Sequence, residues 1–422
     1  MKTRPWKHAI CSAPLALLLW SYLGTAPSAQ AQQWLPLGPN DYNWPSSEPV
    51  TFISLALNAS GNPVVAYPDG ANGSKATVMR WNGSAWTAVG TPGFSAGSVT
   101  YTSLALDASD NPVVAYQDGA NGGKASVMRW NGSAWTAVGT PGFSSGSVAY
   151  ISMALDASGN PVLAYPDGAN SSKATVMRWN GSAWTAVGTP GFSAGSVTYT
   201  SLALDASDNP VVAYRDGANG GKATMMRWNG STWNAVGTPG FSAGNAFYTT
   251  LALDASGNPV VAYQDVANGN RATVMRWSES AWTAVGTPGF SLGSGTYTSL
   301  ALDASGNPVV AYRDAANGGK ATVMRWNGSA WTAVGTPGFS AGSVDYTSLA
   351  LDASGNPVVV YQGEANGFKA TVMLWNGSAW NALGTPGFSA GRANYTSSAM
   401  DASGNPVVAY TDGANGGKAT VM

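Results

Sequence analysis

Aromatic and charged side chains recur at fixed positions along this 422-residue chain, and three sets of them could do chemistry. The first set is aromatic and recurs every 49 residues, at Phe52, Tyr101, Tyr150, Tyr199, Tyr248, Tyr297, Tyr346 and Tyr395. If these side chains form a ring at the mouth of a channel, they could stack on a flat ligand or a sugar. The alternative is that they pack against recurring loop phenylalanines, at Phe94, Phe143, Phe192 and onward.

The second set combines arginine with tryptophan. Arg129 precedes Trp130, and Trp135 follows five residues later; the arrangement recurs in other repeats, with Leu374 once replacing the arginine. The two tryptophans have the parity to share a face of a hairpin, so cross-strand aromatic packing is the default interpretation. If Arg129, Trp130 and Trp135 were instead exposed between repeats, they would resemble a sugar-binding pocket.

The third set is charged. An aspartate such as Asp118 is followed six residues later by a cation such as Lys124, and Gly363 replaces the aspartate in one repeat. Opposite charges at the two ends of a hairpin loop predict cross-strand ion pairs, each contributing about 0.2–1 kcal/mol. A calcium site is disfavoured because the loop offers too few carboxylates and ends on a positive charge. We therefore expect no metal.

The N-terminus has the pattern of a secretory signal peptide. Lys2, Arg4 and Lys7 give a basic start, residues 13–23 are apolar, and a small-x-small pattern ends at Ala31. The apolar run is too short to cross a bilayer comfortably. We expect residues 1–31 to be a signal peptide, residues 32–422 to form one domain, and the mature protein to be secreted, periplasmic or on the cell surface.

Processing at this site limits the available chemistry. His8 and Cys11 are the only histidine and cysteine, and both precede Ala31, so the mature chain would lack an imidazole base, a thiol nucleophile and disulfides. Most other ionisable residues recur in six to eight copies, and the exceptions are scattered along the sequence. These exceptions are Asp41, Glu48, Arg215, Glu279, Arg313, Asp345, Glu364 and Arg392. No acid–base pair is apparent, so we predict that the protein is not an enzyme and needs no cofactor.

The elements that position these residues follow from the repeat. Asn62, Asn111 and their equivalents recur every 49 residues through eight copies, and a period of this length without helical periodicity is typical of propeller blades. Within one repeat we predict four strands, at residues 101–107, 112–117, 124–130 and 134–139. Polar and Asn-Gly turns separate them. The sequence therefore predicts an all-β, eight-bladed β-propeller of four-stranded repeats.

The two ends of the repeat array suggest how the ring closes. Residues 34–38 align with the fourth strand of a repeat, and residues 419–422 end within the third strand of the last one. We expect the N-terminal segment to complete the eighth blade and remove an exposed sheet edge. The alternative is a truncated chain whose missing end held further blades.

Two recurring segments carry a resemblance to a known class of protein. The segments Leu-Asp-Ala-Ser-Gly-Asn-Pro-Val-Val-Ala-Tyr and Trp-Asn-Gly-Ser-Ala-Trp resemble those of secreted bacterial β-propeller repeat proteins. The first-turn sequence is similar to NHL and related kelch-superfamily-like repeats, and the tryptophan hairpins resemble those of tachylectin-type propeller lectins. The resemblance covers residues 34–422. It implies the propeller architecture and, through the lectins, sugar binding.

These observations lead to two hypotheses about function. The first is a secreted, non-enzymatic scaffold that binds a protein or a surface through its loop faces. The alternative is a multivalent lectin with one weak carbohydrate site per blade, gaining avidity from repetition. The formal net charge of −1 does not favour nucleic acid, and we expect no membrane insertion and a monomer. The predicted partner is an unidentified protein or glycan.

Overall fold

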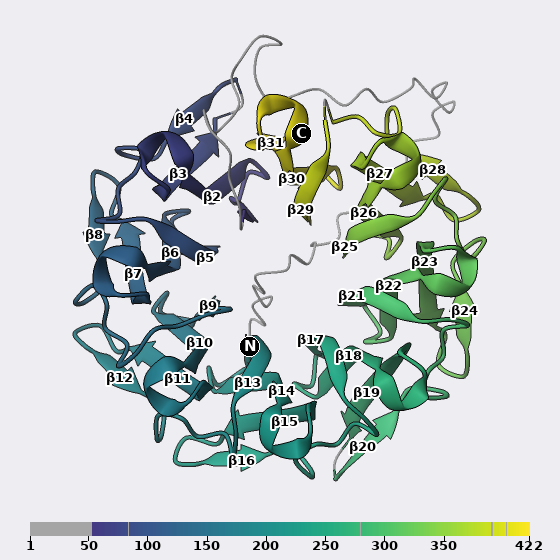
Figure 1. Cartoon of the computed structure of the whole chain (residues 1–422), viewed down its shortest axis with the longest axis horizontal. Coiled ribbons are helices and arrows are strands. Elements are labelled where there is room, and N and C mark those ends of the chain that lie inside the picture. Colours follow the sequence, from purple (N-terminus) through teal and green to yellow (C-terminus); the bar gives the residue numbers. More distant parts are fainter. Residues whose placement is uncertain (1–52, 83, 279, 390, 402) are drawn as a thin grey trace, which may run out of the picture.

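Eight antiparallel sheets surround a central channel in the computed structural model, which describes residues 53–422 except 83, 279, 390 and 402 (Figure 1). Within the described residues, seven sheets have four strands and the eighth has three. In every sheet the strands follow one another in chain order from the channel outward. The predicted eight-bladed, all-β propeller is confirmed.

The strands occupy equivalent positions in successive blades. The innermost are β1 (Ser54–Leu57), β5 (Val99–Leu106), β9 (Ser152–Leu155), β13 (Val197–Leu204), β17 (Ala246–Leu253), β21 (Gly295–Leu302), β25 (Val344–Leu351) and β29 (Ala393–Met400). The second are β2 (Pro63–Asp69), β6 (Pro112–Asp118), β10 (Pro161–Asp167), β14 (Pro210–Asp216), β18 (Pro259–Asp265), β22 (Pro308–Asp314), β26 (Pro357–Gly363) and β30 (Pro406–Asp412). The third are β3 (Lys75–Trp81), β7 (Lys124–Trp130), β11 (Lys173–Trp179), β15 (Lys222–Trp228), β19 (Arg271–Ser278), β23 (Lys320–Trp326), β27 (Lys369–Trp375) and β31 (Lys418–Val421). The outermost are β4 (Trp86–Ala88), β8 (Trp135–Ala137), β12 (Trp184–Ala186), β16 (Trp233–Ala235), β20 (Ala281–Ala284), β24 (Trp331–Ala333) and β28 (Trp380–Ala382).

The core lies between the blades. Val113, Val114 and Ala115 of β6 are completely buried although they point alternately to opposite faces of the sheet. Each hydrophobic cluster accordingly joins two adjacent blades; one contains Val64 of β2 and Val114 of β6. A sheet packed on both sides needs apolar residues at both parities, which is why these strands do not alternate apolar and polar residues.

The first and eighth blades pack together and close the ring. Val65, Trp81 and Trp86 of the first blade share a hydrophobic cluster with Val407 and Val421 of the eighth. The predicted closing strand at residues 34–38 lies outside the described residues. Its pairing with β31 therefore remains a prediction.

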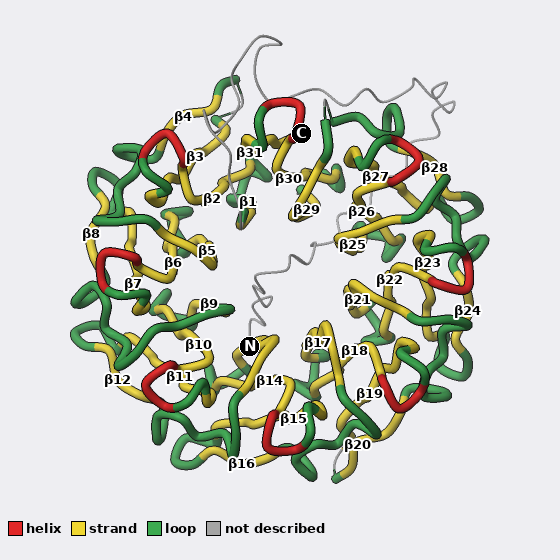
Figure 2. Tube along the Cα trace, viewed as in Figure 1, coloured by secondary structure: helices red, strands yellow, loops and turns green. Residues whose placement is uncertain are grey.

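A single-turn 3-10 helix joins the second and third strands of each blade (Figure 2). These helices are η1 (Gly70–Asn72), η2 (Gly119–Asn121), η3 (Gly168–Asn170), η4 (Gly217–Asn219), η5 (Val266–Asn268), η6 (Ala315–Asn317), η7 (Glu364–Asn366) and η8 (Gly413–Asn415). Asp118 caps η2, accepting hydrogen bonds from Ala120 N at 3.0 Å, Asn121 Nδ2 at 2.9 Å and Ser126 Oγ at 2.7 Å. This side chain is 1% exposed.

The predicted cross-strand ion pairs are wrong. Asp118 and Lys124 are directly opposite in the register, but the carboxylate turns inward to cap the helix. The only ion pair among the described residues joins Arg313 and Asp345. Burial with three hydrogen-bond donors satisfies the aspartate without the lysine.

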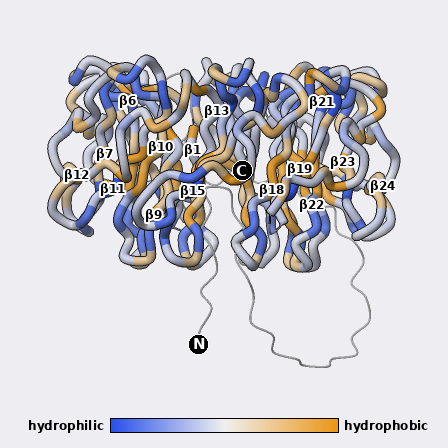
Figure 3. Tube along the Cα trace, turned by 90° about the horizontal axis from the view of Figure 1, so that it is seen from below, coloured by the Kyte–Doolittle hydropathy of each residue, from blue (hydrophilic) through white to orange (hydrophobic). Residues whose placement is uncertain are grey.

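The topology defines two end faces. Each innermost strand begins on the same face as the 3-10 helices and the loops that connect successive blades, which we call the tyrosine face because Tyr101 and its equivalents lie there. The opposite face carries the turns between the first two strands and the last two. Seen from the side, hydrophilic segments gather at both end faces, and hydrophobic segments lie between them (Figure 3).

Candidate functional site

Seven tyrosines follow one another around the channel. Tyr101, Tyr150, Tyr199, Tyr248, Tyr297, Tyr346 and Tyr395 have ring centroids 5.1 to 6.2 Å from the next in sequence. We call this set the tyrosine arc; the eighth aromatic position, Phe52, lies outside the described residues. Tyr150 and Tyr395 are 47% and 38% exposed. The sequence-predicted tyrosines are therefore brought together, with solvent access.

The backbone places each tyrosine in an unusual conformation. All seven have φ between +45° and +53°, a region that non-glycine residues seldom adopt. In β5 the register with β6 shifts between Thr100 and Ser103, so Tyr101 lies in a bulge of the innermost strand. Bulges re-aim side chains, and this one directs the aromatic ring along the channel instead of into the core. The cost of positive φ, of order 1–3 kcal/mol per residue, points to a functional constraint.

Threonines of the following blade hold several of these bulges in place. Thr200 Oγ1 donates a hydrogen bond to the carbonyl of Tyr150 at 2.9 Å, and Thr298 makes the same bond to Tyr248 at 2.9 Å. Thr396 repeats it with Tyr346 at 2.6 Å. The arc is thus coupled from blade to blade through its backbone as well as its rings.

Two cavities open along the arc. The first has a volume of about 420 Å³ and is lined by Ile53, Tyr101, Thr102, Tyr150, Ile151, Tyr346, Tyr395, Thr396 and Ser397. The second has a volume of about 280 Å³ and is lined by Tyr248, Thr249, Thr250, Tyr297, Thr298, Tyr346, Thr347 and Thr396. Both walls combine aromatic faces with hydroxyl groups. The first volume is in the range of small-molecule sites, about 300–1,000 Å³, and the second is just below it.

Four hydroxyl groups of the arc are hydrogen-bond donors at neutral pH. Burial, together with neighbouring tyrosines, raises the pKa of Tyr101 and Tyr248 above the ordinary value of 10.0. Burial first, and then the charge of Asp345 among other causes, raises the pKa of Tyr297; burial, Tyr395 and Asp345 raise that of Tyr346. These phenols therefore stay protonated.

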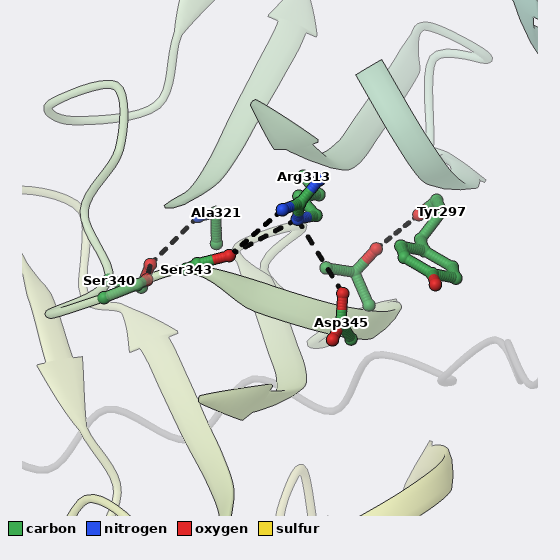
Figure 4. Close-up of polar contacts among 8 residues, drawn as sticks. Tyr297, Arg313, Ala321, Ser340, Ser343 and Asp345 are labelled. Carbon is green, nitrogen blue, oxygen red and sulfur yellow. Dashed lines mark hydrogen bonds and ion pairs between the residues drawn. The ribbon is translucent and has the colours of Figure 1, made fainter. Parts of the chain in front are cut away.

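One charged pair adjoins the arc. Arg313 Nε lies 3.7 Å from Asp345 Oδ1 across the boundary between the sixth and seventh blades, and Arg313 also donates to Ser343 Oγ (Figure 4). Asp345 raises the pKa of three phenols, those of Tyr248, Tyr297 and Tyr346. Arg313 and Asp345 are far apart in the sequence, yet adjacent blades place them together. Both stand out in the sequence as non-repeated charges, but no single repeat carries a signal of this pairing.

The loop phenylalanines do not pack against the arc. Phe94 stacks on Trp135 of the next blade, with centroids 3.9 Å apart and planes 11° apart, and the same pair recurs from blade to blade. The alternative that assigned the tyrosines to packing on these phenylalanines is therefore wrong.

The side chains of the arginine–tryptophan set make contacts between neighbouring blades. Trp130 and Trp135 are directly opposite in the register, and their rings meet edge-on at 5.8 Å, as predicted from parity. Trp135 Nε1 donates to the carbonyl of Val89 at 2.5 Å, and Arg129 Nη2 donates to the carbonyl of Gly159. These residues therefore join neighbouring blades, and they line neither of the two cavities.

The described residues contain neither a cluster suited to a metal ion nor a membrane-spanning helix. Among them, no group of three or more His, Cys, Asp or Glu side chains is arranged to hold a metal ion. Within the same part of the chain, no helix is long and apolar enough to span a bilayer.

Comparison with known proteins extends no further than architecture. No family model matches the chain, and no curated protein matches it. Among solved structures, the six-bladed fucose-binding lectin of Aleuria aurantia is 17% identical, covering 65% of this chain and 92% of its own, with a TM-score of 0.39. AofleA from Arthrobotrys oligospora is 12% identical (82% and 89% covered, TM-score 0.40), and an ulvan lyase is 14% identical (90% and 94% covered, TM-score 0.49). At these values the likeness says nothing of ligand or activity, and the similarity to NHL and kelch repeats stays a prediction.

Proposed function

We propose that this protein is a carbohydrate-binding propeller that holds its ligand on the tyrosine arc and does not turn it over. The observation that carries the proposal is the arc itself: seven contacting tyrosines, all at positive φ, six of which line two cavities at the channel. A pyranose has C–H faces and a rim of hydroxyl groups. A tyrosine has an electron-rich face and a polar hydroxyl, so the two surfaces are complementary.

The distribution of apolar surface favours the same face. The large hydrophobic residues exposed among the described residues are Tyr150, Val266, Leu292 and Tyr395. Two belong to the arc, Val266 opens a 3-10 helix, and Leu292 lies in a loop between blades, so all four are on the tyrosine face. Exposed apolar surface rimmed by polar groups is typical of binding sites.

A site in every blade is less well supported. The tryptophan and arginine that would form such sites already bond to Val89 and Gly159 of neighbouring blades. An added Cβ on Gly90 would lie 2.5 Å from Trp130 and 2.9 Å from Trp135, so the backbone of the preceding blade closes directly over these indoles. We therefore place the carbohydrate at the channel mouth.

Two features argue against turnover. Glycoside hydrolysis ordinarily uses a pair of carboxyl groups, and Asp345 is the one carboxylate that acts on the pKa of arc phenols among the described residues. A phenol that acts as a base needs a lowered pKa, whereas those of Tyr297 and Tyr346 are raised.

The test is a glycan array on the purified chain followed by calorimetric titration of the best ligand. We expect the double variant Tyr297→Leu and Tyr346→Leu to abolish binding, because it removes two of the three tyrosine faces, with their hydroxyls, from the second cavity. The matched control is Thr136→Asn on the outermost strand, since Asn234 and Asn381 occupy the equivalent positions. Absence of binding to any glycan at millimolar concentration would refute the proposal, as would full binding by the double variant.

Export is part of the proposal. The basic and apolar pattern of residues 1–31 supports removal of a signal peptide near Ala31. N-terminal sequencing of the protein recovered outside the cytoplasm should then start at Gln32. Recovery of the intact N-terminus in the cytoplasmic fraction would contradict it.

A further inference from the structure

We infer that the tyrosine arc has a single sugar-selecting point, formed by Arg313 and Asp345 where the sixth and seventh blades meet, and that it takes a neutral pyranose. The inference rests on the proposed function. It replaces the eight equivalent weak sites of the lectin hypothesis with one asymmetric site.

Differences among the repeats concentrate at four positions, which we call the seam positions. On the second strand these are Pro68, Gln117, Pro166, Arg215, Gln264, Arg313, Gln362 and Thr411. After the 3-10 helix they are Ser74, Gly123, Ser172, Gly221, Asn270, Gly319, Phe368 and Gly417. Before the next innermost strand they are Ser98, Ser147, Ser196, Asn245, Ser294, Ser343 and Arg392, and within it Thr100, Ala149, Thr198, Phe247, Thr296, Asp345 and Asn394.

Exposure alone does not explain this pattern. The hairpin between the third and fourth strands is also exposed, on the opposite face, yet its first residue is asparagine in six of seven copies. The seam positions are all on the tyrosine face, beside the arc. The opposite face also varies, as at Asp110 and Asp208, but the differences are concentrated beside the arc, which indicates that this face distinguishes ligands.

The structure brings the seam positions of each boundary together. Arg215 Nε donates to Asn245 Oδ1 at 2.6 Å, and its guanidinium lies 5.1 Å from the centroid of the Phe247 ring. An added Cβ on Gly221 would be 2.6 Å from Asn245 Oδ1, so glycine leaves the room that this arginine occupies. Gln362 Nε2 likewise donates to Asn394 Oδ1 at 3.1 Å. At these boundaries the seam positions therefore form one compact set of side chains.

Only one boundary holds an acid at a seam position. Asp345 is the single carboxylate among these positions, and Arg313 faces it at 3.7 Å. The two side chains are 31% and 36% exposed, so the pair is open to solvent and adds little to stability. Its charges affect the arc: Asp345 raises the pKa of Tyr248, Tyr297 and Tyr346, and Arg313 lowers that of Tyr297.

The chemistry of the pair selects the ligand class. Tyr248, Tyr297 and Tyr346 line the cavity of about 280 Å³, and their rings offer stacking faces. Asp345 lies outside this lining but directly precedes Tyr346 in β25, so the pair would contact the part of a ligand that extends beyond the cavity. A carboxylate accepts hydrogen bonds from two adjacent hydroxyl groups and a guanidinium donates to a third, which matches the rim of a neutral pyranose. A uronate or sulfate would meet the negative charge of Asp345, whereas a neutral sugar can bond to both the carboxylate and the guanidinium.

The experiment titrates the full chain with methyl mannoside, galactoside and glucoside, and with glucuronate as the charged comparison. We expect a stoichiometry of one and the weakest binding for glucuronate. The variants are Asp345→Thr and Arg313→Gln, whose new residues already occupy equivalent positions at Thr296 and Gln264, so the fold tolerates them. Each should weaken neutral-sugar binding about tenfold or more, since a charged hydrogen-bond partner is lost.

The matched control is Arg215→Gln at the boundary between the fourth and fifth blades, which should change the affinity by no more than about twofold. A stoichiometry above one, tighter binding of glucuronate, or unchanged affinity in Asp345→Thr would overturn the inference and leave the proposed function standing. Failure of every saccharide to bind wild-type protein, with an empty glycan array, would overturn both.

Discussion

The indole Nε1 of Trp135 donates a hydrogen bond to the carbonyl of Val89 in the preceding blade, 2.5 Å away. The same bond recurs from blade to blade, and in each the indole also stacks on a loop phenylalanine. The outermost strand thus fastens each blade to the one before it. Its tryptophans support the ring that positions the tyrosine arc.

Trp135→Ala should destabilise the protein strongly. It removes the stack on Phe94, the edge contact with Trp130 and the bond to Val89, and we expect a loss of about 3–5 kcal/mol. Thermal unfolding compared with Thr136→Asn measures the effect. An unchanged melting temperature would mean that the indole is free to serve a ligand between the blades.

Gly90→Ala tests the same contact from the opposite side. Gly90 has φ of +72°, and an added Cβ would lie 2.5 Å from Trp130, so we expect a loss of roughly 2–4 kcal/mol from strain and overpacking. Gly132 also has positive φ, but an added Cβ meets nothing within 4 Å. Gly132→Ala should therefore cost only the backbone strain, about 1–2 kcal/mol. Equal losses in denaturant unfolding would contradict the close packing at Gly90.

Gly363→Asp should stabilise the seventh blade. Gly363 precedes η7 without a side-chain cap, whereas Asp118 caps η2 and accepts a bond from Ser126. An aspartate should restore the cap and add about 1 kcal/mol to the free energy of unfolding. Gly363→Ala, which adds the Cβ without a carboxylate, is the control. A gain of the same size in both variants would show that capping is not the cause.

Alkaline pH should unfold the protein through its buried tyrosines. Burial raises the pKa of a second series of phenols, on the second strands, above 10.0: Tyr67, Tyr116, Tyr165, Tyr214, Tyr263, Tyr312, Tyr361 and Tyr410. Above pH 10 the unfolded chain binds fewer protons than the folded one. Stability is therefore fully present below pH 10 and falls above it, by about 1.4 kcal/mol per pH unit for each such tyrosine.

Tyrosinate absorbance and circular dichroism followed together measure this effect. The buried tyrosines of the second strands should ionise only as the β signal is lost. Complete ionisation with an intact β signal would contradict the burial of the second-strand series.

Local sequence was sufficient for much of the fold. The predicted third strand, 124–130, coincides with β7, and the second differs from β6 by one residue. The first strand begins two residues earlier than predicted, at Val99, because the bulge at Tyr101 lets pairing continue beyond it. A bulge depends on the partner strand, so periodicity within one strand does not reveal it.

The sequence by itself determined the number of blades, the strands within each and the identity of every recurring side chain, because a 49-residue period encodes local pairing and turns. Tertiary structure alone decided how those side chains are used. Asp118 turned inward to cap a helix, Trp135 became a contact between blades, and Tyr101 remained at the channel. It also paired Arg313 with Asp345. The physical reason is that burial and hydrogen-bond satisfaction depend on the neighbouring blade, whose position no single repeat specifies.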